Sequence, residues 1–444
     1  MNKVKLGDCI ELIIDNRGKT PPLAETGYEL IETVSINGSN KYPDYSKITK
    51  FVSEETYNTW FRKGHPTSGD ILISTVGMNI GDVVIMKSNR GSIAQNLIAL
   101  RTNNKLNSDY LYYILTSKNI REKIRSLNIG SAQPSLKVPH LLNIEFYLPN
   151  IEKQSEISKI LNELDEKIEL NTQINQTLEQ IAQTIFKSWF IDFDPVHAKA
   201  NALASGQTAE QATQAEMAVI SGKNTQELHR LQTANPEQYQ QLWEIAEAFP
   251  SGFDEEGVPR GWEERELSYL FEFLSGAQPP KSEHIYEEKE GYERFIQNRD
   301  YSNDNHKTYI PISKKNKRCT EKDILMDKYG EAGKVRYGIK GAYNVALAKI
   351  VPQKDNLREF LRSYFTQDKI RNYLSSSSMA STRNSLNSTT FTRMKVIVPN
   401  DFLLSTFDKL ANEKIDKILQ IKQENIELSK LRDYLLPKLL SGEV

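Results

Sequence analysis

Apolar residues follow two different spacings along the chain. Up to about residue 150 they occur in short runs bounded by glycine or asparagine, which predicts strands separated by turns. These strands are expected at 70–74, 82–86, 97–100 and 144–148. After Pro149 the apolar residues recur every seven positions, which is typical of a coiled-coil seam. The pattern predicts a mixed α/β domain followed by a long helix.

The same plan occurs a second time, about 250 residues further along. Residues 110–121 align with residues 360–371, and residues 144–150 align with residues 394–400. A helix is expected at 108–127, with Ser108 or Asp109 as its N-cap, and its counterpart near 357–374. The second set of strands is expected at 323–326, 334–337, 345–350 and 395–398. The duplication predicts an α+β protein with a pseudo-twofold internal repeat that binds its partner at two places.

Two long helices carry the seven-residue repeat. The first seam consists of Ile157, Leu164, Asn171, Leu178 and Ile185, with Leu161, Ile168, Asn175 and Ala182 at the companion spacing. The second carries Phe407, Ile415, Ile418, Ile421, Leu428, Leu431 and Leu435. Asn171 and Asn175 are expected to lower the stability of the coiled coil, but to fix the register of its helices and the choice of partner helix. We expect the helices to pair as an antiparallel coiled coil, although the connector of about 60 residues also permits a parallel pair.

Five segments result from these patterns. They are a mixed domain at 1–150, a long helix at 151–195, an acidic helical connector at 196–260, a second mixed domain at 261–400 and a second long helix at 401–444. Capping-box spacing at Thr208 and Asn224, and an asparagine before Pro236, predict helices within the connector. The connector is interpreted as a solvated spacer, with a partner-docking surface as the alternative.

Charge is unevenly distributed although the formal net charge is only -1. Residues 201–260 contain nine acidic and three basic residues, whereas 301–318 and 334–349 are basic. This local excess suits a polyanionic partner, with ordinary solvated loops as the alternative. Two cysteines and six scattered histidines give neither a disulfide framework nor metal-ligand spacing. Without an apolar signal region or membrane-length run, the protein is expected to be intracellular and cytoplasmic.

Several ordered motifs carry a family resemblance. They are Gly69–Ser74 with Gly77 and Gly81, Gly130–Gln133, Leu148-Pro149 through Gln154 and Ile157, Phe186–Val196, Phe249–Trp262 and Leu435–Glu443. In this order they resemble the specificity subunit of type I restriction-modification enzymes over nearly the whole chain. The second copy departs from the pattern, since residues 399–402 lack a counterpart of Gln154 and 376–385 replace the Gly-Ser-Ala-Gln turn.

The resemblance implies a non-catalytic reader of double-stranded DNA. Each mixed domain is expected to recognise one half of a split target, with the helices as spacer and as docking scaffold for two adenine-methylating modification subunits. Restriction subunits join that complex. No methyltransferase motif, phosphate loop or dinucleotide fingerprint is found, so no cofactor is expected. The alternatives are a single-chain DNA methyltransferase, disfavoured by the missing motifs, and a protein-binding coiled-coil scaffold, disfavoured by the basic polar loops.

Candidate DNA contacts follow from side-chain chemistry, because Arg and Lys can bond guanine and Asn and Gln can bond adenine in the major groove. In the first domain they are Arg17, Lys19, Asn37, Ser39, Asn40, Lys41, Asn79, Gln133, Ser135 and Lys137. In the second domain they are Gln278, Lys281, Gln297, Asn298, Arg299, Lys314, Lys315, Lys317, Arg318, Lys328, Arg336, Arg383 and Asn384. The apolar helix ends, Trp189, Phe190, Leu439 and Leu440, are expected to contact a modification subunit or the opposing helix end.

Overall fold

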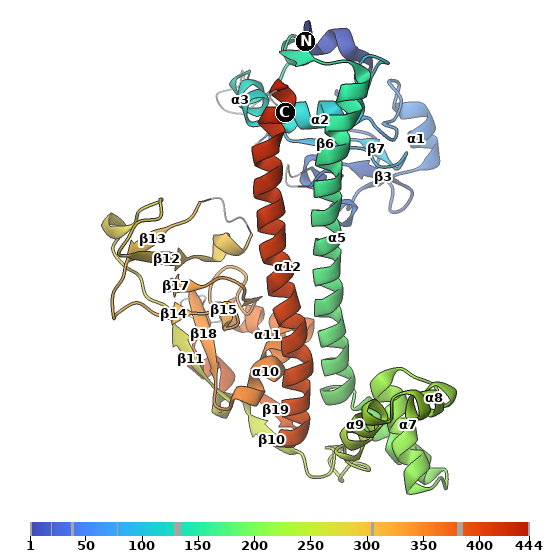
Figure 1. Cartoon of the computed structure of the whole chain (residues 1–444), viewed down its shortest axis with the longest axis vertical. Coiled ribbons are helices and arrows are strands. Elements are labelled where there is room, and N and C mark those ends of the chain that lie inside the picture. Colours follow the sequence, from blue (N-terminus) through green and yellow to red (C-terminus); the bar gives the residue numbers. More distant parts are fainter. Residues whose placement is uncertain are drawn as a thin grey trace. The chain divides into compact units, whose positions relative to one another are not determined.

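The computed structural model describes residues 2–18, 20–36, 40–77, 79–127, 135–302, 306–379 and 385–442. Its contacts divide the chain into two compact units, Met1–Asn171 with Gln423–Val444, and Thr172–Lys422. The division cuts through both long helices, α5 (Ile151–Phe190) and α12 (Asp401–Ser441) (Figure 1). Each unit therefore combines one mixed domain with part of each long helix.

Three small sheets build the mixed domain of the first unit. Their strand orders are β2 (Ile10–Ile14), β8 (Leu97–Thr102), β5 (Ile71–Ser74) and β6 (Val83–Ile85); β4 (Phe51–Val52), β3 (Tyr28–Ile31) and β7 (Ser92–Ile93); and β1 (Asn2–Lys5) with β9 (Glu145–Leu148). Strand β5 is buried on both faces, since Ile71 and Ile73 enter one apolar cluster and Leu72 enters another. This explains why its sequence is a continuous apolar run.

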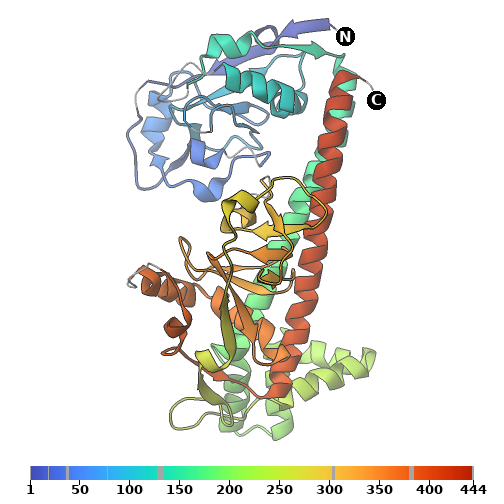
Figure 2. The same cartoon turned by 90° about the vertical axis from the view of Figure 1, so that its left-hand side faces the viewer.

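The mixed domain of the second unit repeats this topology with one additional strand in its second sheet (Figure 2). Its orders are β11 (Phe271–Ser275), β18 (Leu347–Pro352), β15 (Ile324–Asp327) and β16 (Val335–Arg336); β13 (Tyr309–Pro311), β12 (Tyr292–Ile296), β17 (Gly341–Tyr343) and β14 (Arg318–Cys319); and β10 (Glu263–Glu266) with β19 (Lys395–Val398). In both domains one pair is parallel, β3 with β7 and β12 with β17, while the other pairs are antiparallel. The duplication predicted from sequence is thus present in the fold.

One glycine in each copy marks the same close approach. A Cβ added to Gly91 would lie 2.7 Å from the carbonyl oxygen of Glu29, and one added to Gly341 would lie 2.5 Å from that of Arg294. The two glycines also adopt positive φ, 81° and 154°. Both sit beside the parallel strand pair, which therefore imposes a glycine at matching positions.

The helices of the two mixed domains differ from the sequence predictions in their breaks and in one N-cap. Residues 108–127 form two helices, α2 (Ser108–Thr116) and α3 (Lys118–Ser126), because Ser117 is extended (φ −61°, ψ 142°). Its counterpart Gln367, with ψ 131°, separates α10 (Arg358–Thr366) from α11 (Asp368–Met379). The N-cap is Asn107, whose side chain accepts from the Tyr110 backbone, and neither Ser108 nor Asp109. Short helices α1 (Glu54–Trp60) and α4 (Val138–Leu142) complete the first domain.

The long helices run antiparallel in the first unit. In the first unit Asp165 pairs with Arg432 at 2.8 Å, and Asn171 donates to Asn425 at 2.8 Å. In the second unit the ring of Phe186 lies 5.7 Å from that of Phe407. Rising numbers on α5 thus face falling numbers on α12, which excludes the parallel alternative.

Burial along α5 and α12 follows the predicted seam with one exception. Ile157 and Leu161 are fully buried, and Asn171 and Asn175 are only 1% and 8% exposed. The prediction for Leu431 is wrong, because this residue is 45% exposed while its neighbour Arg432 turns inward to Asp165.

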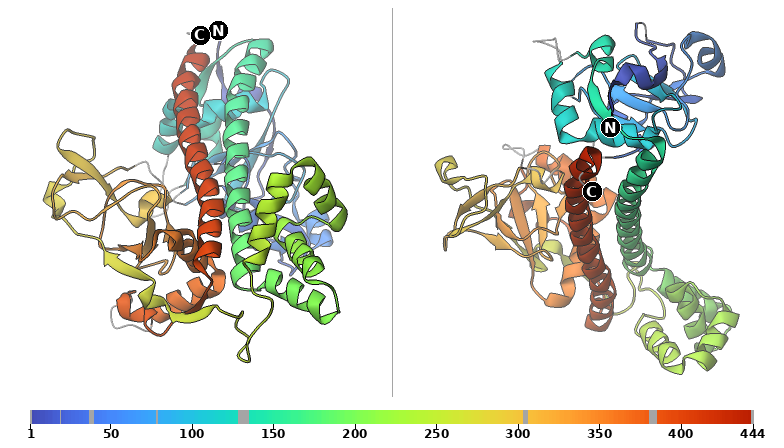
Figure 3. Two further views of the ribbon diagram at one scale, coloured as in Figure 1. Left: turned by 60° about the horizontal axis from the view of Figure 1, so that its bottom comes forward. Right: turned by 45° about the horizontal axis from the view of Figure 1, so that its top comes forward.

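The connector folds into four helices at the C-terminal end of α5 (Figure 3). They are α6 (Asp194–Ala204), α7 (Ala209–Ser221), α8 (Thr225–Ala234) and α9 (Pro236–Glu247). The predicted capping boxes at Thr208 and Asn224 are confirmed, as is the cap before Pro236. Met217, Leu228, Tyr239 and Ala246 form its own small core. The connector is therefore a packed helical module that belongs to the second unit.

The apolar helix ends are buried inside the chain. Trp189 and Phe190 are 3% and 2% exposed, and their rings contact Phe407 at 6.3 and 5.3 Å. Leu439 is 3% exposed in the core of the first unit, against which Leu440 also packs. Of the two predicted roles, contact with the opposing helix end is the one that this burial supports, and contact with a modification subunit stays a prediction.

A candidate nucleic-acid interface

Three backbone segments converge at the end of β5. The Thr75 amide and hydroxyl both donate to the Asn96 carbonyl oxygen, at 2.9 and 3.0 Å. The Leu136 amide donates in turn to the Thr75 carbonyl oxygen at 2.9 Å, and Val76 forms a bridge with Ser135. The turn after β5, the residues before β8 and the segment entering α4 therefore meet at one edge of the domain.

The same convergence occurs at the end of β15. The Lys328 amide donates to the Ala346 carbonyl oxygen at 2.8 Å, and the Leu386 amide donates to the Lys328 carbonyl oxygen at 3.2 Å. Lys328 thus stands where the first domain has Thr75. Because the duplication preserves this convergence of backbone segments, the loops that meet there are the best-supported candidate for a binding surface used twice.

Some predicted contacts lie outside the described residues. They are Lys19, Asn37, Ser39, Gln133, Arg383 and Asn384, together with the Gly130–Gln133 motif. In the sequence, residues 128–134 directly precede Ser135 and Leu136, which contact the end of β5. Residues 380–384 precede Leu386 in the same way, and Leu386 bonds to the residue after β15.

Two predicted basic residues have internal roles. The Lys41 ammonium, with its side chain 9% exposed, pairs with Asp109 at 2.7 Å and also bonds Asn162. The Arg336 guanidinium, also 9% exposed, pairs with Asp327 and Glu331, each at 2.8 Å. Burial lowers and these carboxylates raise the pKa of Arg336, with a net upward shift. We correct the prediction for Lys41 and Arg336, because each cation is buried and already neutralised.

Two further arginines have exposed side chains but carboxylate partners. Arg17 forms two bonds with Asp15, at 2.7 and 2.6 Å. Arg318 contacts Glu293 through two bonds of 2.6 and 2.7 Å. Burial raises the pKa of Glu293 and the bond from Arg318 lowers it, with a net downward shift that keeps this carboxylate ionised. DNA binding at either arginine would have to compete with an existing ion pair.

The remaining predicted side chains differ mainly in exposure. Exposed are Asn40, Asn79, Lys137, Gln278, Lys281, Arg299, Lys314, Lys315 and Lys317, while Ser135, Gln297 and Asn298 are partly buried. The three lysines Lys314, Lys315 and Lys317 lie between β13 and β14. They are suited to phosphate contact, which needs reach and charge rather than a fixed geometry.

Lys328 differs from all of these. It is 8% exposed, and its ammonium donates to the Ser275 hydroxyl at 2.9 Å. Within the described part of the chain no carboxylate pairs with it. Nearby Asn344, which was not predicted from sequence, has a buried side-chain oxygen without a hydrogen-bond partner. Its only sequence signal is a polar residue inside the apolar stretch 341–350.

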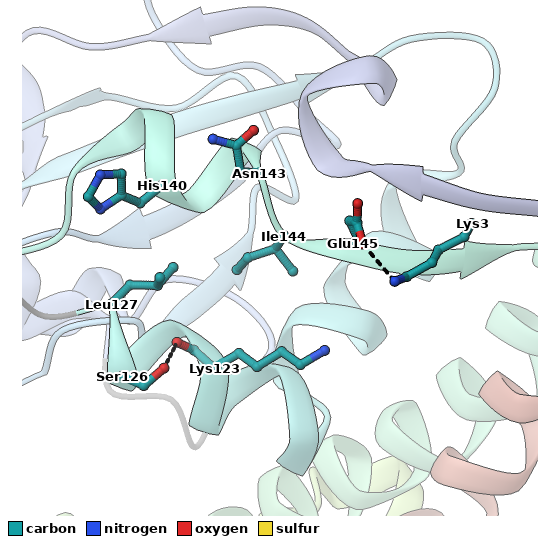
Figure 4. A pocket seen from close by; sticks show the side chains of 8 residues that line it. All are labelled: Lys3, Lys123, Ser126, Leu127, His140, Asn143, Ile144 and Glu145. Carbon is teal, nitrogen blue, oxygen red and sulfur yellow. Dashed lines mark hydrogen bonds and ion pairs between the residues drawn. The ribbon is translucent and has the colours of Figure 1, made fainter.

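A hollow of about 460 Å³ lies elsewhere on the first domain, between α3, α4 and β9. Figure 4 shows Lys123, Ser126, His140 and Asn143 around it, with Lys3 and Glu145 paired at 2.6 Å. The lining contains no arrangement of nucleophile and base. Across the residues that the structure describes, no group of His, Cys, Asp and Glu is placed to hold a metal, and no helix is long and apolar enough to cross a membrane.

Comparison with known proteins decides the family. The family model described as the type I restriction modification DNA specificity domain matches residues 1–180 and 259–432. The chain belongs to this family. The two matched segments are the two copies of the repeat, so much of the connector lies outside the DNA specificity domain matches.

Similar proteins agree with this assignment. The HindI specificity subunit of Haemophilus influenzae is 34% identical over 402 residues, which cover 85% of this chain and 86% of that protein. The MjaIX specificity subunit of Methanocaldococcus jannaschii is 28% identical over 351 residues, covering 76% and 69%. Among solved structures, the S subunit of a type I restriction-modification system from M. genitalium gives a TM-score of 0.52 at 16% identity, covering 99% and 95%. That structure supports the fold of a specificity subunit.

Proposed function

We propose that this chain is the DNA-recognition subunit of a type I restriction-modification complex, with each mixed domain reading one half of a split target. The observation that carries the proposal is the convergence of loop segments that occurs at the same place in both domains. Thr75 and Lys328 occupy matching positions at the ends of β5 and β15, and each joins three backbone segments. A rigid scaffold that presents loops at one edge is a common arrangement for a binding site.

The chemistry of recognition belongs to the side chains on these loops. Amide groups such as those of Asn79 and Gln278 can bond adenine in the major groove, and lysines between β13 and β14 can hold phosphates. Phosphate contacts set position and base contacts set sequence. Binding should therefore weaken steeply with salt while the preferred sequence stays the same.

The long helices space the two domains and provide the scaffold for two modification subunits, and restriction subunits join this core. Methyl transfer and DNA cleavage are carried out by those other subunits in the cytoplasm, where the chromosome is accessible. The specificity chain determines which DNA sequence the complex binds, and it needs no cofactor of its own.

The proposal is tested by expressing the full chain with its modification subunit in a host that lacks adenine methylation. Sequencing of methylated genomic DNA is expected to show one motif of two specific parts separated by an unspecified spacer. Methylation at a continuous motif would contradict two-domain reading. Binding of a radiolabelled methyl donor by the purified chain alone would instead favour a single-chain methyltransferase.

A further inference from the structure

Four backbone segments pack tightly where β15 ends in the second domain. The Ala277 amide donates to the Tyr343 carbonyl oxygen at 3.2 Å, and the Asn344 amide donates to that of Ile296 at 3.0 Å. A Cβ added to Gly276 would lie 2.0 Å from the Asn344 carbonyl oxygen. Together with the bond from Lys328 to Ala346, these contacts fix residues 276–277, Ile296, Lys328 and residues 343–346 relative to one another, and Asn298 follows Ile296 by two positions.

Polar groups at this place are buried without full compensation. The Lys328 ammonium has three donors, and the Ser275 hydroxyl, a neutral acceptor, takes one of them. The ring of Tyr329 lies 5.7 Å from the ammonium and adds only a weak cation–π contact. The side-chain oxygens of Asn298 and Asn344 are buried and have no hydrogen-bond partner. Leaving such groups unsatisfied is costly, so their presence needs an explanation.

Three other buried or partly buried cations of the second unit are each paired with a carboxylate. Arg336 pairs with Asp327 and Glu331, and Arg362 pairs with Glu359 at 2.8 Å. Arg294 likewise lies 3.1 Å from Asp300. The hydrogen-bond partner of the Lys328 ammonium is instead the neutral hydroxyl of Ser275. A buried cation beside a neutral acceptor is suited to a partner that arrives from outside.

We propose, resting on the function proposed above, that Lys328 reads a guanine in the half-site of the second domain, with Asn344 and Asn298 beside it. The ammonium donates to the O6 and N7 acceptors of guanine, and the amide oxygens accept from the exocyclic amino group of a neighbouring cytosine or adenine. The first domain has Thr75 and Ala94 in place of Lys328 and Asn344. Its half-site therefore does not use this contact.

The test uses the full chain with its modification subunit, and compares Lys328→Met with Lys289→Met. Methionine keeps most of the buried stem of Lys328 and removes its charge, while Lys289 is an exposed lysine of the same domain that is not a predicted DNA contact. Lys328→Met is expected to reduce discrimination at one guanine of one half-site about 10- to 100-fold, with the other half-site unchanged. Lys289→Met should leave the motif unaltered. Asn344→Ala is expected to relax an adjacent position of the same half-site.

Two outcomes would overturn this inference. One is an unchanged motif for Lys328→Met at normal stability. The other is uniformly weaker binding to all sequences with a salt slope reduced by about one, which would make Lys328 a phosphate contact. If Lys328→Met does not fold, Lys328→Gln, which also removes the charge, and Asn344→Ala provide the same readout, and an unchanged motif for both would equally overturn the inference. A wild-type complex without a split motif would refute the proposed function itself.

Discussion

Glu216 is a fully buried carboxyl in the connector, and its titration makes the stability of the connector depend on pH. Lys199 lies 2.9 Å from it and also donates to the carbonyl oxygens of Ala246 and Phe249, each at 3.2 Å. Burial raises the pKa of Glu216 to about 8, and the Lys199 ammonium acts in the opposite direction. An acid whose pKa is raised on folding favours the folded state at low pH, and this contribution is lost as pH rises from its unfolded value to about 8.

Glu216→Gln keeps the shape of the side chain and removes the titration. Its melting temperature is expected to be close to that of the wild type at pH 5 and to exceed it increasingly up to pH 8, because the wild type must ionise a buried group. Thermal unfolding at several pH values measures the difference. A variant that instead loses stability relative to the wild type as pH rises would show that the ionised pair with Lys199 dominates. Glu210→Gln, at an exposed connector position, is the matched control.

Residue-level prediction from sequence succeeded where the determinants are local. The boxes at Thr208 and Asn224 depend on residues three positions away, so they could be recognised. Lys41 could not be recognised as structural, because its partners Asp109 and Asn162 are distant in sequence. Lys328 was selected for its charge alone, and its burial beside Ser275 became visible only in the structure.

The C-terminal end of α5 joins the second unit through an aromatic cluster. Trp189 contacts Phe249 at 5.3 Å, and Phe190 contacts Phe360 at 5.4 Å. Trp189→Ala or Phe190→Ala is expected to destabilise the second unit by about 3 to 5 kcal/mol, because a large side chain is removed from a closed core. Ile181→Ala on the same helix should cost much less, since Ile181 is 40% exposed. Urea unfolding monitored by circular dichroism compares them, and equal small effects would contradict burial of the helix end.

Elements were predictable in proportion to their length and regularity. The seven-residue repeat identified both long helices, because each turn adds evidence for the same face. Strands of two or three residues, such as β4, β7 and β14, have too few positions to show alternation. The break at Ser117 was missed because serine does not signal a helix end as proline or glycine does.

At the scale of the whole molecule, the two long helices are proposed to set the distance between the half-sites of the target. Inserting one heptad at matched positions in the middle of α5 and α12 keeps the seam in phase and lengthens it by about 10 Å. At about 3.4 Å per base pair, the unspecified spacer is expected to grow by about three base pairs, with weaker binding because the domains also rotate relative to the grooves. An active variant with its original spacing would contradict the role of the helices.

The duplication was predictable at this level because repeated motifs survive in sequence, whereas the composition of each unit was not. Both units contain parts of α5 and α12 that are far apart along the chain. The antiparallel arrangement of α5 and α12 decides which helix end packs into which core. The length of the connector was compatible with either a parallel or an antiparallel pair, so it could not decide this. The burial of Leu439 in the first unit and of Trp189 in the second follows from that arrangement.

Independent reading by the two domains is tested most directly by exchanging residues 1 to about 145 for the same region of a relative with a different target. The chimera is expressed with its modification subunit, and the methylated motif is sequenced after its assembly and melting have been matched to the parent. We expect one half of the motif to become that of the relative, while the other half and the spacer stay unchanged. A chimera that assembles normally and changes both halves, or neither, would contradict the account.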